Sequence, residues 1–436
     1  MEIDIRMPAL PAAGRGKITR WLKARGSAVR AGDVLAEVAS ARATMEIEAE
    51  ADGILSEILV AAGSEELAGD ALLARMTQTA APGSEIAAVA PPPADATPEP
   101  LASAFPPGAR IVSMSVRDAL RDALAEEMRR DPDVFVIGEE VADYNGPHKV
   151  TQGLLEEFGP RRVVDTPITE HAFSGLGVGA AFAGLRPVVE FMSFSFALQA
   201  ADHIINSAAK ARYVSGGQMS CPIVFRGPNG AAPGVGAQHA QDYAAMFCNV
   251  PGLKVVAPWS AADAKGLLKS AIRDPDPVVF LENEILYGET SDVPLGADWT
   301  VPIGKARVVR AGQDVTIVSF SIGMAAALKA AQALAAQGVE AEVIDLRTLR
   351  PLDVETLVAS VRKTGRCVSV EEGWPQCGIG AEIAALMMEH AFDALKAPVL
   401  RVTGADVPMP YAARLEKLAL PGAHDVVSAV MRVLRR

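Results

Sequence analysis

Short hydrophobic runs alternate with longer amphipathic segments over most of the chain after residue 113. The runs are typical of buried strands, which we expect at 134–137, 163–164, 188–191, 223–225, 255–256 and 278–281. Apolar residues recur at helical spacing from Val116 to Met128, and further helices are expected at 172–183, 196–213 and 261–272. This alternation predicts a parallel sheet with helices on both faces.

A second alternation begins after Ile303. Strands are expected at 315–319, 341–344, 367–370 and 399–402, with helices at 324–337, 353–363 and 379–388. We therefore predict two α/β domains, at 113–293 and 303–436. The segment from Pro294 to Pro302 is the expected connection between them.

The first 76 residues contain an internal repeat. Residues 22–38 are echoed by residues 59–75, and both copies have short β-type runs separated by Gly-Ser and Gly-Asp turns. Two such halves predict a small, flattened all-β barrel at 1–76. The composition then shifts to Ala, Pro, Ser and Thr. Because so few large apolar residues cannot offset the entropy of ordering, 77–112 should be an extended linker.

Composition narrows the class of protein. Half of the 436 residues are hydrophobic, enough for two or three cores, and the formal net charge is −12. Nucleic-acid-binding proteins usually carry a basic face, so no such partner is expected. The start of the chain lacks signal-peptide features, and the most apolar helical run, 172–185, is too short and Gly-rich to span a membrane. The four cysteines lack metal-ligand spacing, which favours free thiols and a cytoplasmic location.

The segment from Val163 to Gly175 is the best candidate for a functional site. Glu170 lies between a short buried strand and a helix rich in small residues. Ligands of open α/β sheets bind at this end of the strands, and a carboxylate among apolar neighbours can hydrogen-bond a heterocycle. Helix capping is the alternative interpretation, and on position alone it is the more frequent one.

Several ordered motifs resemble one enzyme family. Asp-Thr-Pro-Ile-Thr-Glu at 165–170, with Val-Phe-Val-Ile-Gly-Glu-Glu-Val at 134–141 and Glu-Phe-Met-Ser-Phe-Ser-Phe at 190–196, resembles the beta subunits of the pyruvate dehydrogenase decarboxylase component. The resemblance continues through 222–230, 237–239, 281–284 and 402–411 to the end of the chain. It implies a transketolase-like pyrimidine-binding domain and a C-terminal transketolase-type domain. It also implies thiamine diphosphate-dependent oxidative decarboxylation of pyruvate, with acetylation of a lipoyl group.

The resemblance assigns roles to individual residues. Glu170 matches the glutamate that hydrogen-bonds the aminopyrimidine ring, and His239 matches a residue that handles protons during acyl transfer. The remaining cofactor-binding positions implied by the family are Glu139, Ile168, Met192, Phe196 and Gln199. From the pattern alone, Phe196 could equally be a core aromatic on the same side of an extended segment as Phe194. Glu139 could be an ordinary loop carboxylate.

The resemblance also implies cations and partners. Main-chain carbonyls hold K⁺ in the family, and the matching positions are Ile223, Ala271, Ile272, Asp274 and Asp276, although a plain turn explains this segment too. The chain lacks the Gly-Asp-Gly motif that holds Mg²⁺ and the diphosphate. We therefore expect an alpha subunit to supply that half of the site in an α₂β₂ heterotetramer, which would act on a dihydrolipoyl acyltransferase core.

The first segment resembles a lipoyl domain whose acceptor lysine has been replaced. The matching hairpin reads Ala-Ser-Ala-Arg-Ala-Thr-Met-Glu at 39–46, so the acceptor position holds Arg42. A protonated guanidinium does not form the amide bond to lipoate, and we expect no modification. The barrel is then either a relic or a docking and assembly module. For the whole chain, a branched-chain 2-oxo acid or acetoin dehydrogenase beta subunit and a catalytically silent scaffold are the alternatives.

Overall fold

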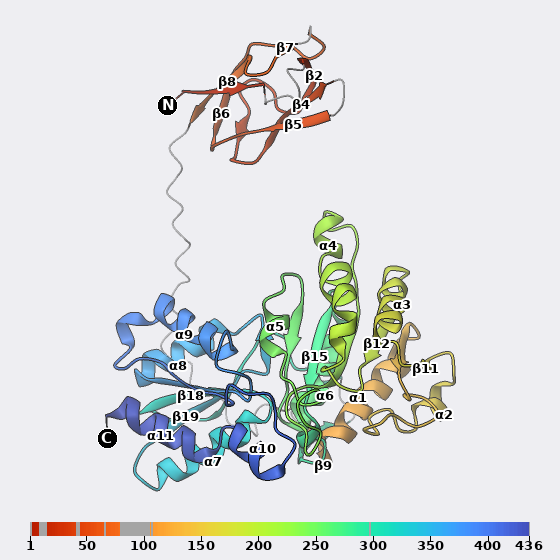
Figure 1. Ribbon diagram of the computed structural model, residues 1–436, viewed down its shortest axis with the longest axis vertical. Coiled ribbons are helices and arrows are strands. Elements are labelled where there is room, and N and C mark those ends of the chain that lie inside the picture. Colours follow the sequence, from red (N-terminus) through yellow and green to blue (C-terminus); the bar gives the residue numbers. More distant parts are fainter. Residues whose placement is uncertain are drawn as a thin grey trace. The chain divides into compact units, whose positions relative to one another are not determined.

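The structure is a computed structural model that describes residues 2–7, 15–40, 44–64, 67–78, 105, 108–295 and 298–435. The chain forms two compact units, Met1–Pro91 and Pro92–Arg436 (Figure 1). The prediction for Arg42 and most of the expected linker at 77–112 lie outside the described residues. The domain limits drawn from the sequence stay predictions.

The first unit is the expected flattened β-barrel. Its two four-stranded sheets have the orders β1-β8-β6-β3 and β5-β4-β2-β7. The strands are β1 Glu2–Arg6, β2 Arg15–Trp21, β3 Ala28–Val29, β4 Val34–Ser40, β5 Thr44–Glu48, β6 Gly53–Ile58, β7 Leu67–Ala68 and β8 Leu72–Gln78. Between the sheets lie buried side chains from both halves, including Ile18, Leu35, Leu55 and Leu73.

The sequence repeat explains how the barrel closes. Each copy supplies one short and one long strand, and each short strand joins the sheet that contains the other copy's long strand. Gly26 and Gly63 occupy equivalent positions, with φ of 87° and 81°, a conformation that glycine adopts without strain. Their N–H groups donate to Leu55 O at 2.7 Å and Ile18 O at 2.8 Å. These turns hold the two halves together symmetrically.

The second unit begins with a seven-stranded sheet of order β11-β10-β12-β13-β15-β14-β20. All neighbours are parallel except β20, Thr348–Arg350, which is antiparallel to β14. The other strands are β10 Val134–Gly138, β11 Val163–Asp165, β12 Arg186–Glu190, β13 Val224–Pro228, β14 Lys254–Val256 and β15 Val278–Glu282. The six parallel strands confirm the expected α/β alternation.

Helices cover both faces of this sheet. On one face, α1 Val116–Arg130 and α6 Ala261–Arg273 pack together over a shared core. The other face is covered by α3 Glu170–Phe182, α5 Ala244–Cys248 and the segment after β12. A short helix, α2 Leu154–Phe158, precedes β11. Ser115 caps α1 by accepting the N–H of Asp118 at 3.1 Å.

The single helix expected at 196–213 is wrong in detail. The segment forms a 3₁₀ turn η3 Ala197–Ala200, a π-helical stretch η4 His203–Ala208 and a short α4 Ala211–Val214. Ala209 N–H bonds to Ile204 O at 3.1 Å, one residue further back than in an α-helix. This wider turn is a local insertion that hydrophobic periodicity does not predict.

A five-stranded sheet of order β17-β19-β18-β21-β22 forms the second α/β layer system. Its strands are β17 Arg307–Arg310, β18 Val315–Ser319, β19 Ala341–Asp345, β21 Cys367–Val370 and β22 Leu400–Val402. Its helices are α7 Gly323–Ala335, α8 Val354–Thr364, α9 Ile379–His390, η6 Phe392–Ala394, α10 Ala413–Ala419 and α11 Ala423–Leu434. All strands and long helices expected here are confirmed to within a few residues.

Strand β20 links the two larger sheets of the second unit, and a separate two-stranded sheet begins the segment that connects them. Strand β20 follows β19 of the smaller sheet in the chain, but it pairs with β14 and so extends the larger sheet. The expected connection begins as a strand, since β16 Thr290–Leu295 pairs with β9 Arg110–Ser115; a 3₁₀ turn, η5 Glu284–Leu286, precedes it. The sheets are therefore linked by strand pairing as well as by the chain.

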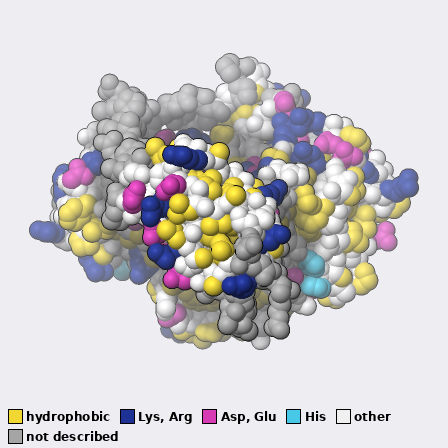
Figure 2. All heavy atoms as spheres, turned by 90° about the horizontal axis from the view of Figure 1, so that it is seen from above, with side chains coloured by type: hydrophobic (Ala, Val, Ile, Leu, Met, Phe, Trp, Pro, Cys, Tyr) yellow, Lys and Arg dark blue, Asp and Glu magenta, His cyan; other side chains and the backbone are white. Residues whose placement is uncertain are grey.

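The surface of the described residues mixes both kinds of charge. On the face shown in Figure 2, Lys and Arg side chains are interspersed with Asp and Glu, and hydrophobic side chains lie among them. Among the described helices, none is both long and apolar enough to cross a membrane. All four cysteines are free, with Cys221 and Cys367 buried and Cys377 exposed.

Candidate active site

The predicted residues meet where parallel strands end. In the sheet register Gly138 pairs with both Asp165 and Glu190, so β10, β11 and β12 finish at the same edge. Glu139 follows β10 directly, Glu170 begins the helix after β11, and Met192 lies two residues beyond β12. Three sequence segments therefore deliver candidate side chains to one edge, as ligand sites of open α/β sheets require.

Glu139 and Glu170 form the centre of this site. Their exposures are 6% and 5%. In the part of the chain that the structure describes, Glu139 Oε1 and Glu170 Oε2 are buried without a hydrogen-bond partner. Leaving a buried acceptor unsatisfied costs about 1–3 kcal/mol. Helix capping therefore does not account for Glu170, and both oxygens suit a ligand that brings N–H or O–H donors.

The charge of Glu170 also acts on Glu139. Burial, together with the charges of Glu170 and Glu140, raises the pKa of Glu139 to about 7. Glu139 therefore keeps its proton to a higher pH than an ordinary glutamate does. Such a group can donate a proton or accept one without a change of solution conditions. The site thus provides Glu170 as a hydrogen-bond acceptor and, beside it, an exchangeable proton on Glu139.

The aromatic wall of the site differs from the expected geometry. The chain turns at this point, with Phe196 N–H donating to Ser193 O at 3.0 Å, so the expected extended segment is wrong. Phe194 is fully buried in the core, whereas Phe196 is only partly buried. The Phe196 ring meets the His239 ring edge-on, with centroids 4.9 Å apart. The turn therefore separates a core aromatic from one that is available at the site.

The remaining predicted residues mark an open side. Ile168 is 78% exposed, and Gln199 and His239 are also exposed. Gln199 belongs to η3, which packs against α3, the helix that begins with Glu170. These three residues, which the sequence predicts beside the buried carboxylate pair, are thus exposed in this chain. The site is not sealed within this chain.

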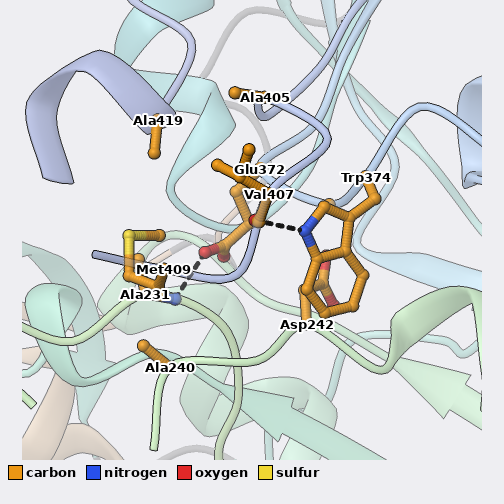
Figure 3. Close-up of a pocket in the computed structure, with 10 residues that line it drawn as sticks. Ala231, Ala240, Asp242, Glu372, Trp374, Ala405, Val407, Met409 and Ala419 are labelled. Carbon is orange, nitrogen blue, oxygen red and sulfur yellow. Dashed lines mark hydrogen bonds between the residues drawn. The ribbon is translucent and has the colours of Figure 1, made fainter. Parts of the chain in front are cut away.

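The loop that carries His239 is held by the smaller sheet's connections. Glu372 Oε2 accepts the N–H of Ala231 at 2.6 Å, and Glu416 Oε1 accepts that of Gly234 at 2.7 Å. Figure 3 shows this hydrogen bond between Glu372 and Ala231, which both line a small cavity of about 20 Å³. Burial and the charge of Asp242 raise the pKa of Glu372 well above its usual range. Sequence reasoning missed this contact because residues 231 and 372 are far apart in the chain.

Comparison with known proteins now identifies the family. Residues 112–290 match the pyrimidine binding domain of transketolase, and residues 304–426 match the C-terminal domain of transketolase. Residues 3–76 match the biotin-requiring enzyme family. The pyruvate dehydrogenase E1 component subunit beta of Rhizobium meliloti is 57% identical over 457 residues, which covers 99% of each chain. This chain belongs to the E1 beta-subunit family. Because the match spans both units, the family resemblance includes the N-terminal barrel.

Other relatives support the same assignment. The E1 beta subunit of Rickettsia bellii is 62% identical and covers 74% of this chain and 99% of its own. The mitochondrial subunit beta-1 of Arabidopsis thaliana is 62% identical, and the match covers 77% of this chain and 93% of its own. Among solved structures, a split-gene transketolase, an inactive beta4 tetramer, has a TM-score of 0.61 at 27% identity. The match covers 74% of this chain and 98% of the transketolase chain. The transketolase-like fold is thus shown by both sequence and structure.

The positions expected to hold K⁺ gather at the opposite edge of the sheet. Ile223 precedes β13, and the other four lie at the end of α6 or in the loop before β15. Four of these carbonyls accept protein donors. Val278 N donates to Ile223 O at 3.0 Å and Asp274 N to Ala271 O at 3.3 Å, and Arg186 Nη1 donates to Ile272 O at 2.9 Å and to Asp274 O at 3.5 Å. The Asp274 and Asp276 carboxylates pair with Lys254 and Arg212. The structure brings these positions together, and K⁺ binding stays a prediction.

A buried charge network lies beneath the site, and sequence reasoning missed it. Arg226 is 1% exposed; it forms two 2.5 Å bonds to Glu282 and also contacts Glu190. Tyr287 donates to Glu282 at 2.7 Å. Glu190 and Glu282 end two strands, and Arg226 lies on β13 between them. The network therefore fixes the ends of three neighbouring strands.

Proposed function

We propose that this chain is the beta subunit of a thiamine diphosphate-dependent pyruvate dehydrogenase. With an alpha subunit it decarboxylates pyruvate oxidatively and acetylates the lipoyl group of the acyltransferase, which gives acetyl-CoA in the complex after glycolysis. The observation that carries this proposal is the buried pair Glu139 and Glu170, whose free oxygens face no protein donor among the described residues. The names of its relatives give the substrate.

The chain's own residues fit an aminopyrimidine ring. Glu170 Oε2 would share a proton with a ring nitrogen, and Glu139, with its raised pKa, would exchange a proton beside it. Phe196 and Met192 would provide the apolar surface against the ring, with Gln199 and Ile168 at the rim. When bound, thiamine diphosphate supplies the carbanion that adds to the 2-oxo carbon of pyruvate.

His239 is suited to the second half-reaction. Its ring is exposed but held by contact with Phe196, at the open side of the site. An imidazole there would transfer protons while the acetyl group passes to a lipoyl arm that arrives from outside. The backbone contacts to Glu372 and Glu416 would hold the loop during this step.

The open side of the site and the missing Gly-Asp-Gly motif support dependence on an alpha subunit. That subunit would hold Mg²⁺ and the diphosphate in a cytoplasmic α₂β₂ heterotetramer. K⁺ at the carbonyls of Ile223, Ala271, Ile272, Asp274 and Asp276 would support the sheet edge. With Arg42 at the acceptor position, the barrel would carry no lipoate and serve docking or assembly, or persist as a relic.

The test is co-expression with the partner alpha chain, followed by thiamine-dependent release of carbon dioxide. Pyruvate, branched-chain 2-oxo acids and acetoin are assayed separately, and we expect pyruvate to give the highest kcat/KM. Glu170→Gln should abolish release while leaving assembly unchanged. Faster turnover of another substrate would reassign the specificity, and no release with any substrate would favour the silent scaffold.

A further inference from the structure

His148 lies outside every role assigned so far, yet it touches the proposed cofactor site. Its Nε2 is 3.1 Å from the carbonyl oxygen of Met192. A carbonyl only accepts hydrogen bonds, so Nε2 carries the proton and donates. Met192 is a pocket residue, and the bond goes to its backbone. His148 therefore helps to fix the position of the main chain at Met192.

The loop that carries His148 also carries Glu139. It runs from the end of β10 to α2 and is tied near its start by Asp165, which accepts the N–H groups of Ala142 at 2.6 Å and Asp143 at 3.1 Å. His148 makes the second tie, to the segment after β12. The loop thus bridges the ends of two strands, β11 and β12, that flank β10 in the sheet.

The conformation of this loop needs such ties. Glu140, Asn145 and Lys149 all have positive φ, between 54° and 62°, which is unfavourable for residues with a side chain. Strained backbone persists only where the surroundings determine it. Loss of one tie should therefore let the loop relax, and Glu139 would move with it.

The buried charge network orients the imidazole. Its ring packs on Tyr287 with centroids 5.4 Å apart, and Tyr287 is fixed by its hydrogen bond to Glu282. The loop backbone is close to Glu190, since a methyl group added at Gly146 would lie 3.6 Å from Glu190 Oε1. His148 is thus held from below while its Nε2 points at Met192.

We propose that His148 is a positioning residue that joins the Glu139 loop to the Met192–Phe196 segment and so sets the pyrimidine pocket. The inference rests on the proposed function, and it assigns no chemistry to the imidazole. Its consequence is that removing the Nε2 donor weakens cofactor binding without affecting pyruvate recognition.

The experiment compares His148→Gln, His148→Asn and His148→Phe in the reconstituted heterotetramer. The Gln amide reaches the position of Nε2, the Asn amide only that of Nδ1, and Phe keeps the ring on Tyr287 without a donor. We measure the Kd of thiamine diphosphate by calorimetry with Mg²⁺ present, the Tm of the cofactor-free assembly, and the KM of pyruvate.

The Asn and Phe variants should raise the Kd about tenfold, as expected for one hydrogen bond, and Gln should stay within about threefold of the parent. The cofactor-free Tm should fall by no more than about 2–4 °C, the shift expected for one hydrogen bond, and the pyruvate KM should not change. Equal affinities for parent, Asn and Phe, or the same loss for Gln and Asn, would overturn the inference. If Phe prevents assembly, the Asn and Gln pair decides. A parent assembly that binds no cofactor would instead refute the proposed function.

Discussion

Replacing Glu139 with Gln tests the carboxylate pair directly. A pKa of about 7, against the usual 4.5, means that the folded protein holds this proton more tightly than the unfolded chain does. The stabilisation is complete below pH 4.5 and is lost as the pH rises through 7. At 1.36 kcal/mol per pKa unit, ionised Glu139 costs at most about 3 kcal/mol at pH 8. Glu139→Gln removes this cost because the amide never ionises.

The assay is thermal unfolding of the cofactor-free heterotetramer between pH 5 and pH 8. Since 1 kcal/mol shifts Tm by about 2–4 °C in domains of this size, the variant should melt several degrees above the parent at pH 8 and close to it at pH 5. Glu156→Gln is the control, because Glu156 is exposed and is not among the charges that raise the pKa of Glu139, and it should stay within about 0.5 kcal/mol of the parent. A lower Tm at pH 8, or a difference independent of pH, would refute the reasoning.

Three further predictions follow from other parts of the molecule. Arg226→Met leaves two carboxylates buried without their cation and should destabilise by about 3–5 kcal/mol in urea unfolding, whereas Arg212→Gln removes an exposed ion pair and should cost less than about 1 kcal/mol. Equal effects would contradict the role of burial. Intact-mass spectrometry after co-expression with a lipoate ligase should show no adduct on residues 1–76, and the Arg42→Lys variant should gain one. Thiamine diphosphate with Mg²⁺ at 100 times its Kd should stabilise the heterotetramer by about 2.7 kcal/mol and leave the isolated chain unchanged. A Tm shift in the isolated chain would show that the site is complete without a partner.

Much of the fold could be predicted because hydrophobic periodicity is a local property. The strand before Glu170 and the helix after it are visible within 20 residues, and the structure has both. Strand β20 was missed because three residues at 348–350 have no pattern of their own. They become a strand only through pairing with β14, about 90 residues earlier in the chain. The turn between Phe194 and Phe196 was missed because alternating aromatics are equally typical of an extended segment.

The residues of the site could be predicted from the sequence, but the buried charge network next to them could not. Glu170, Phe196 and His239 stand in recognisable motifs, whereas Arg226 shows its role only when the sheet register places it opposite Glu190. The charge network contains two carboxylates for one guanidinium, and it is satisfied by hydrogen bonds within the protein. Glu139, which follows the neighbouring strand β10, and Glu170 keep buried oxygens without partners among the described residues. The fully hydrogen-bonded Arg226 network holds the strand ends in place, so the site keeps its shape despite the unsatisfied oxygens of Glu139 and Glu170. Their free-energy cost is offset when a ligand with N–H or O–H donors binds.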